Sequence, residues 1–334
     1  MADVKFLDFS DSLLRQGTMD ADELLEFRRM TGKDFEISAD EADILFKVND
    51  AVETPEGWPE YFINAISHYL LNQTKPERYM TPAKAAWLRA RIEHDGVVES
   101  ETELALLLSL LRQADNVTDG IEQFALEQVG QAVLHGKGYI GKQRELKPGV
   151  IGETELYILR QVLYSASGDK GISISRTEAE FIFDLNEATL TAENHDDWQD
   201  LFVKAMTNHL MMVTAYEEPD RLEALRQENW LRDTTPSVGI NAVFKSIFNK
   251  DYKANVGSAS DVLYGNKDTS QSDKMFNDAD MAEAEKITFD EASWLIERLN
   301  HDGQLDANER ALLAHLKQEC PNIHANLTPL LNAA

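Results

Sequence analysis

Apolar residues recur at intervals of three and four along most of this chain, the spacing that places them on one face of an α-helix. The segment 58–71 spaces Trp58, Phe62 and Ala65 in this way, and the segment 198–211 repeats the pattern. The pattern predicts an all-α fold. We expect at most short strand-like bridges, where paired loops meet.

The helical pattern belongs to three blocks that occur twice, in the same order. The matching pairs are 41–51 with 178–188, 58–71 with 198–211, and 81–96 with 288–303. Three ordered matches indicate an internal duplication. We therefore expect two tandem, divergent helical bundles, in which Trp58 and Trp87 occupy positions like those of Trp198 and Trp294.

The repeats divide the chain into an N-terminal bundle, 1–135, and a C-terminal bundle, 152–334, with an insertion at about 213–283 in the second. The connection 136–151 is the most basic stretch of the chain, with Lys137, Lys142, Arg144 and Lys147. It is interpreted as a solvated linker, and the alternative is a docking site for the acidic body of the protein.

The insertion contains a short apolar segment, followed by a polar tail over 265–283. On a helix, one face of this segment would carry Ile240, Val243, Phe244, Ile247 and Phe248. Such a face is typical of a helix that docks into a partner's groove. The alternative is that the same face packs onto the second bundle.

The amino-acid composition limits the kinds of partner that the protein is expected to bind and the cellular compartment in which it is expected to lie. With 32 basic and 59 acidic side chains the formal charge is −27, which disfavours binding to nucleic acid and to anionic membrane surfaces, and favours cations or a basic protein. Cys320 is the single cysteine, so no internal disulfide forms. The start of the chain lacks the features of a signal peptide, and no apolar stretch is long enough to span a membrane. We expect a cytoplasmic protein.

Four helix junctions share the pattern of a capping box, in which a Ser or Asp caps the helix and a Glu three residues later reaches back to the cap. The pairs are Ser38 with Glu41, Ser100 with Glu103, Ser175 with Glu178, and Asp306 with Glu309. These glutamates are therefore expected to serve the helix ends. Arg91 with Asp95 and Arg298 with Asp302 are expected to pair at four-residue spacing.

The same junctions resemble degenerate EF-hands, with an apolar eighth loop position and a carboxylate four residues later. Two pieces, Asp95-Gly-Val-Val98 and Asp302-Gly-Gln-Leu305-Asp-Ala-Asn-Glu309, also look like the Asp-Gly element of helical, acidic TerB-like tellurite-resistance domains. The first loop position departs from the EF-hand, with Arg298 in the fourth loop. The resemblance implies possible Ca²⁺ ligands at Asp169, Ser173, Glu178, Asn300, Asp302, Asp306 and Glu309.

Sequence motifs for catalysis are weak. Gly136, Gly138 and Gly141 spell a dinucleotide-binding pattern, but a helical segment precedes it and Pro148 follows, so the context is wrong. The leading hypothesis is a non-enzymatic cytoplasmic interaction or adaptor protein or a stress-related protein, with a protein partner and no cofactor. The alternative is a divalent-cation sensor or buffer. A third hypothesis is an enzyme that uses His94 and His301.

Overall fold

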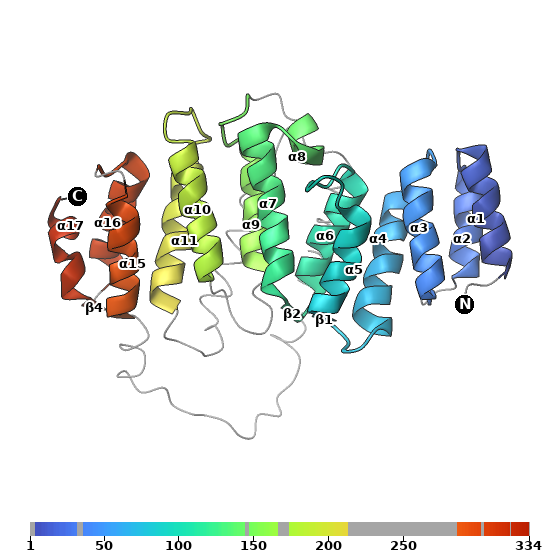
Figure 1. The fold of residues 1–334 in the computed structure, drawn as a ribbon, viewed down its shortest axis with the longest axis horizontal. Coiled ribbons are helices and arrows are strands. Elements are labelled where there is room, and N and C mark those ends of the chain that lie inside the picture. The colour runs from blue at the N-terminus through green and yellow to red at the C-terminus, as the bar shows by residue number, and fades with distance from the viewer. Residues whose placement is uncertain are drawn as a thin grey trace, which may run out of the picture. The chain divides into compact units, whose positions relative to one another are not determined.

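A computed structural model describes residues 4–31, 36–143, 147–165, 174–212, 286–301, 304–320 and 322–333 (Figure 1). These residues are mostly helical, which confirms the predicted all-α class. They divide into two compact units, the first running to Ala125 and the second beginning at Leu126. The division therefore falls inside one helix, α7 (Asp119–His135).

The first unit is built from helices joined by short connections. They are α1 (Val4–Gln16), α2 (Ala21–Met30), α3 (Ala39–Ala51), α4 (Trp58–His68), the π-helical turn η1 (Tyr69–Gln73), α5 (Pro82–Ile92) and α6 (Glu101–Gln113). Gly57 precedes α4 with a φ of 109°, a left-handed conformation that glycine adopts without steric cost. A side chain at Gly57 would therefore strain the start of the helix that carries Trp58.

The second unit begins within α7, at Leu126, and continues with α8 (Gly138–Gln143), which lies in the stretch predicted as a linker. The remaining helices are α9 (Glu153–Ser165), α10 (Arg176–Ala188), α11 (Trp198–Met212), α15 (Phe289–Leu299), α16 (Ala307–Glu319), the 3₁₀ turn η3 (Ala325–Leu327) and α17 (Thr328–Ala333). None of the helices in the described ranges combines the length and the hydrophobicity needed to cross a bilayer.

In the described part of each unit there is one short parallel strand pair. In the first, β1 (Tyr79–Met80) pairs with β2 (Asn116–Val117), and in the second, β3 (Lys286–Ile287) pairs with β4 (Asn322–Ile323). Each pair joins the residues before one helix to those after the next helix, so it closes an α-helical hairpin. Short strand-like bridges are thus present, as expected, and an isolated bridge also joins Thr18 to Glu53, in the connections after α1 and after α3.

The predicted capping boxes are confirmed at Ser38, Ser175 and Asp306. At each, the cap side chain accepts from the backbone N–H of the third helical residue, and the Glu at that residue accepts from the N–H of the cap. At α6 the Ser100 hydroxyl accepts from the Glu103 N–H at 3.4 Å. These bonds satisfy amides that a helix start leaves without intrahelical partners, which explains where these helices begin.

The aromatic cores of the two units have matching contacts. Phe46 packs edge-to-face on Phe62 with ring centroids 5.1 Å apart, and Phe183 packs on Phe202 at the same distance. The edges of these rings meet the neighbouring faces in the arrangement that aromatic pairs prefer.

The paired tryptophans of the predicted repeats have similar but not identical surroundings. The Trp58 Nε1 donates to Asn49 Oδ1 at 3.3 Å, and the Trp198 indole donates to Asn186 Oδ1 at 3.2 Å. Both rings are buried. Trp87 is half-buried, however, whereas its partner in the sequence repeat is buried to 3% exposure.

Candidate functional site

The two richest cation loops of the sequence are only partly described. Asp169, Ser173 and Asp302 lie outside the described residues. The Glu178 carboxylate, which is described, accepts from the Ser175 N–H at 2.7 Å and so caps α10. Asn300 ends α15, where its backbone N–H donates to Ile296 and Arg298 carbonyls.

The remaining carboxylates of the fourth loop bind protein donors. Asp306 Oδ1 accepts from the N–H groups of Asn308 and Glu309, and its Oδ2 accepts from Asn186 Nδ2 on α10 at 2.7 Å. The Glu309 carboxylate accepts from the Asp306 N–H at 2.8 Å. Asp306 therefore starts α16 and ties it to α10. In the described ranges, no group of three or more His, Cys, Asp and Glu side chains is arranged to hold a metal ion.

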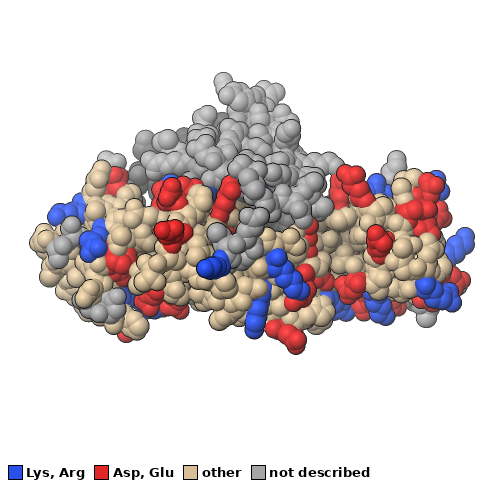
Figure 2. All heavy atoms as spheres, turned by 90° about the horizontal axis from the view of Figure 1, so that it is seen from above, with Lys and Arg blue, Asp and Glu red and all other residues tan. Residues whose placement is uncertain are grey.

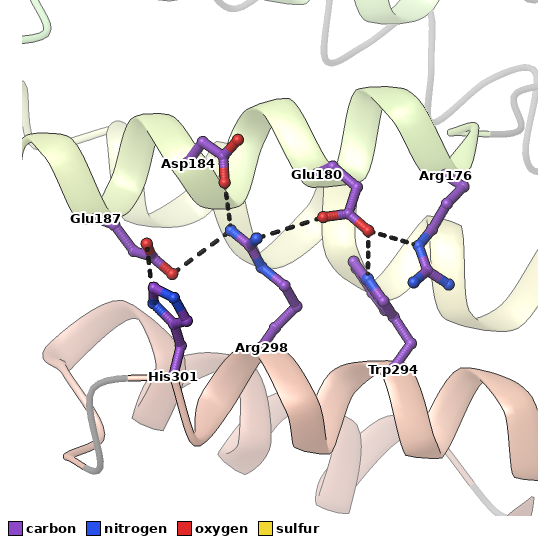
Figure 3. Close-up of polar contacts among 7 residues, drawn as sticks. All are labelled: Arg176, Glu180, Asp184, Glu187, Trp294, Arg298 and His301. Atoms are coloured by element: carbon purple, nitrogen blue, oxygen red, sulfur yellow. Dashed lines mark hydrogen bonds and ion pairs between the residues drawn. The ribbon is translucent and has the colours of Figure 1, made fainter.

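A dense charged site lies where α15 runs alongside α10, around Arg298 (Figure 3). Its guanidinium reaches Asp184 at 2.6 Å, Glu180 at 3.3 Å and Glu187 at 3.4 Å, three carboxylates on α10. The Arg298 side chain is only 16% exposed, so these contacts are partly screened from water. The planar guanidinium can donate to several carboxylates at once, which a lysine ammonium does less well.

Glu180 connects this site to a second cation and to the core. Its Oε1 accepts from Arg176 Nε at 2.7 Å and from Trp294 Nε1 at 2.8 Å (Figure 3). Burial acts to raise the pKa of Glu180, but the hydrogen bonds from Arg176 and Trp294 and the charges of Arg176 and Arg298 outweigh it and lower the pKa. The ionised carboxylate is thus the stable form, and it holds the Trp294 ring in place.

The first unit has a smaller version of this contact. Arg91 pairs with Asp43 on α3 at 2.6 Å, and its guanidinium lies 3.7 Å from the centre of the Trp87 ring. The predicted pairing of Arg91 with Asp95 is therefore wrong, because the long side chain reaches across to α3 instead. Asp95 itself has a φ of 51°, in the turn that closes α5.

The first unit also contains a buried carboxyl group. Glu103, at the start of α6, is 2% exposed. Burial, followed by the charge and the hydrogen bond of Asp50, raises the pKa of Glu103 to about 8. Burial also raises the pKa of Asp50, against the lowering effects of Asn49 and His94.

The two histidines of the enzyme hypothesis have different surroundings. His301 Nδ1 lies 3.5 Å from Glu187 Oε2, and its side chain is 71% exposed. His94 forms a backbone bridge with Val97 in the turn between α5 and α6. Glu187 is thus a carboxylate neighbour of His301. The apolar face of Ile240, Val243, Phe244, Ile247 and Phe248 lies outside the described residues.

Sequence reasoning missed the contacts of Arg298 with α10. The signal was present in the repeats, because the alignment that pairs Arg91 with Arg298 also pairs Asp43 with Glu180. An arginine and a carboxylate retained together in both blocks predict a contact between two helices. The raised pKa of Glu103 left no comparable signal in the sequence, because Glu103 has the position of an ordinary capping glutamate.

No protein-family model, curated protein or solved structure matches this chain.

Proposed function

We propose that the chain is a non-enzymatic cytoplasmic interaction protein, an adaptor whose partner is a basic protein. The observation that carries the proposal is that the charged residues considered as candidate site residues have structural roles. Glu178, Asp306 and Glu309 cap helices, and Glu180 and Arg298 join α10 to α15. Groups used in this way hold the fold together, so the exposed surface is the part left for function.

The charge of that surface supports a basic partner. The formal net charge is −27, and Figure 2 shows Asp and Glu side chains in several groups on the face it presents, with Lys and Arg between them. Asp184 illustrates the point, since its side chain is 66% exposed although it contacts Arg298. Exposed negative charge accelerates association with a positive partner and makes binding sensitive to salt.

The test is co-purification of the tagged chain from its native cell at two salt concentrations. We expect basic proteins to be retained at about 0.1 M salt and lost at about 1 M, because the screening length falls from about 10 Å to about 3 Å. Retention that does not depend on salt would argue for an apolar surface, and the absence of any reproducible partner would contradict the adaptor proposal.

We also propose that the two units are divergent copies of one EF-hand-like, TerB-like helical unit. The support comes from the sequence blocks together with the matching contacts of Trp58 and Trp198 with Asn49 and Asn186. An experimental structure tests it: α3 to α6 should superpose on α10, α11, α15 and α16. Different crossing angles in the two sets would contradict a common origin.

A divalent-cation sensor is the alternative function, favoured by the EF-hand phasing of the loops. Calcium titration separates the two. If millimolar Ca²⁺ raises the melting temperature by several degrees, and Glu178→Gln or Glu309→Gln abolishes the shift, the loops bind the ion. If neither the wild type nor the variants respond, the capping role accounts for both glutamates.

A further inference from the structure

In the second unit, the Glu180 carboxylate contacts two guanidinium groups, one at each of its oxygens. Arg298 Nη1 lies 3.3 Å from Glu180 Oε2, and Arg176 Nε donates to Glu180 Oε1 at 2.7 Å (Figure 3). The central carbon of the Arg176 guanidinium also lies 4.6 Å from the centre of the Trp294 ring. A carboxylate oxygen and an indole ring both attract a guanidinium, so together they hold the Arg176 side chain.

The first unit has the same side chains except for one arginine. The repeat aligns the carboxylate, the tryptophan and the first arginine of the two units, as Asp43 with Glu180, Trp87 with Trp294 and Arg91 with Arg298. The second arginine, Arg176, aligns with Ala39, an exposed residue at the first position of α3. The first unit therefore has a methyl group at the position where the second unit has a guanidinium.

The contacts of Asp43 leave one of its oxygens available. Arg91 Nε and Nη2 lie 2.7 Å and 2.6 Å from the same oxygen, Asp43 Oδ1. Among the described residues, none donates a hydrogen bond to Asp43 Oδ2, and none accepts one from the Trp87 indole N–H. The Asp43 side chain is 44% exposed and Trp87 is half-buried, whereas Trp294 is buried. A cation from outside the chain can therefore reach both groups.

We propose that the first unit binds an arginine side chain of a basic protein partner at Asp43 and Trp87, in the position that Arg176 occupies in the second unit. The incoming guanidinium donates to Asp43 Oδ2 and lies against the exposed part of the Trp87 indole. Arg91 remains on Asp43 Oδ1. This arginine site rests on the proposed function, because the protein that supplies the side chain is the basic partner of the adaptor.

The chemistry of the arginine site favours arginine over lysine. A guanidinium is planar, so it can donate to a carboxylate along one edge while its flat face contacts an aromatic ring. A lysine ammonium is a compact, strongly hydrated charge and contacts the ring less well. Asp40 lies three residues before Asp43, on the same side of α3, and its exposed side chain adds negative charge that attracts a cation.

The direct test follows the indole N–H signals of the full chain by NMR while a short peptide that alternates glycine with arginine is added. The Trp87 signal, identified by its loss in Trp87→Phe, should shift and saturate. The matching lysine peptide should bind at Trp87 about tenfold more weakly, because the ammonium cannot use the ring and the carboxylate together. An unmoved Trp87 signal, or equal binding of the two peptides, would overturn the proposal.

Ala39→Arg gives the first unit the arginine that the second unit already has. Ala39 is exposed, so the new side chain leaves the core intact and competes for Asp43 from within the chain. The arginine peptide should then bind at Trp87 about tenfold or more weakly than to the wild type. Ala39→Gln is the matched control, because it adds a long polar side chain without charge, and it should bind as the wild type does. Unchanged binding in Ala39→Arg, or equal weakening in Ala39→Gln, would contradict the arginine site.

The second unit provides the reverse variant. Arg176→Ala removes the guanidinium that lies over Trp294, so the Trp294 indole signal should become sensitive to the arginine peptide. The Arg176 side chain is 55% exposed, so its removal leaves the core of the unit in place. A Trp294 signal that stays insensitive would show that this position does not accept a guanidinium from outside, which would count against the equivalent site in the first unit.

Co-purification separates the arginine site from the adaptor function. If the wild type retains basic proteins at about 0.1 M salt and Ala39→Arg loses them, the site holds the partner. If both retain the same proteins, the partner binds elsewhere, so the arginine site is wrong and the adaptor function stands. If the peptide titrates Trp87 but the wild type retains no basic protein, the site binds arginine and the adaptor function fails.

Discussion

Arg91 in the first unit and Arg298 in the second each lie over an aromatic ring, Trp87 and Phe183 respectively. Arg91 reaches α3 and Arg298 reaches α10, but the carboxylates that they contact there differ. Arg91 pairs with Asp43, whereas Arg298 contacts Glu180, Asp184 and Glu187. The sequence repeat places Lys47 where the second block has Asp184. The second unit has therefore concentrated negative charge around its arginine.

The same two blocks differ at the next polar position. Asp50, near the end of α3, has a pKa raised by burial, while Glu187 in the second unit contacts Arg298 and His301. The aromatic contacts beneath are alike in both. The comparison teaches that apolar spacing specifies the packing of these helices, whereas the polar residues above it can be exchanged and give the units different responses to pH.

The largest expected effect tests the common packing. Phe46→Ala and Phe183→Ala should each cost about 3–5 kcal/mol of unfolding free energy, because each removes a buried ring and leaves a cavity. Both residues are buried and contact a second ring at 5.1 Å. Denaturant unfolding of each variant measures the cost. A near-neutral result for one of the two variants would contradict the view that Phe46 and Phe183 pack in equivalent positions.

A smaller effect tests the difference between the arginines. Arg298→Leu should cost about 2–3 kcal/mol, because it leaves three carboxylates facing one another. Arg91→Leu should cost about 1 kcal/mol, since it separates a single half-exposed pair. Thermal unfolding gives both values. Arg298→Lys serves as the control and should recover only part of the loss, because an ammonium cannot reach all three carboxylates. If Arg91→Leu and Arg298→Leu lowered the unfolding free energy equally, the two arginines would not differ in their contribution to stability.

Much of the fold was predictable from local patterns. Trp58 and Phe62 stand four residues apart in a helical pattern, and Ser38 and Glu41 form a capping box, so the helix and its start follow from neighbouring residues. The structure confirms the all-α class and these caps. Local signals suffice because helix formation and capping depend on contacts within one turn.

The candidate sites were less predictable because they depend on residues far apart in sequence. Arg298 and Glu180, for example, are separated by 118 positions in the sequence. A local sequence pattern does not specify which of several nearby carboxylates a long arginine side chain will contact. Arg91 shows the consequence, since four-residue spacing favoured Asp95 and the structure selects Asp43.

The two units should also differ in how their stability changes at acid pH, because the second unit contains the buried His209. His209 is buried, its Nδ1 lies 2.8 Å from the Ile174 carbonyl oxygen, and its ring packs on Trp294. Burial lowers the pKa of His209, which outweighs the hydrogen bond to Ile174. The unfolded chain therefore binds this proton more readily, so stability present above the ordinary value of 6.5 is lost as the pH falls below it.

Thermal unfolding between pH 7.5 and 5 measures this acid response. His209→Gln should flatten it, because the amide can donate to Ile174 without titrating. His301→Gln is the matched control, since His301 is 71% exposed and should leave the acid limb nearly unchanged. The first unit has Tyr69 packed on Trp87 where the repeat places His209, so no acid loss is expected there. An unchanged acid limb in His209→Gln would assign the response to another group.

The smallest expected effects concern the two capping boxes that both units share. Ser38→Ala and Ser175→Ala should each cost about 1 kcal/mol, because each hydroxyl accepts from the N–H of the third helical residue, and alanine leaves that amide without its acceptor. Glu41→Gln and Glu178→Gln should be mild, since glutamine also completes a capping box. Denaturant unfolding of the four variants, at constant salt and without calcium, compares them. Equal costs for the two serines would show that the helix starts are interchangeable; a loss at Glu178→Gln much greater than at Glu41→Gln would mean that the charge of Glu178 has a second role in the second unit.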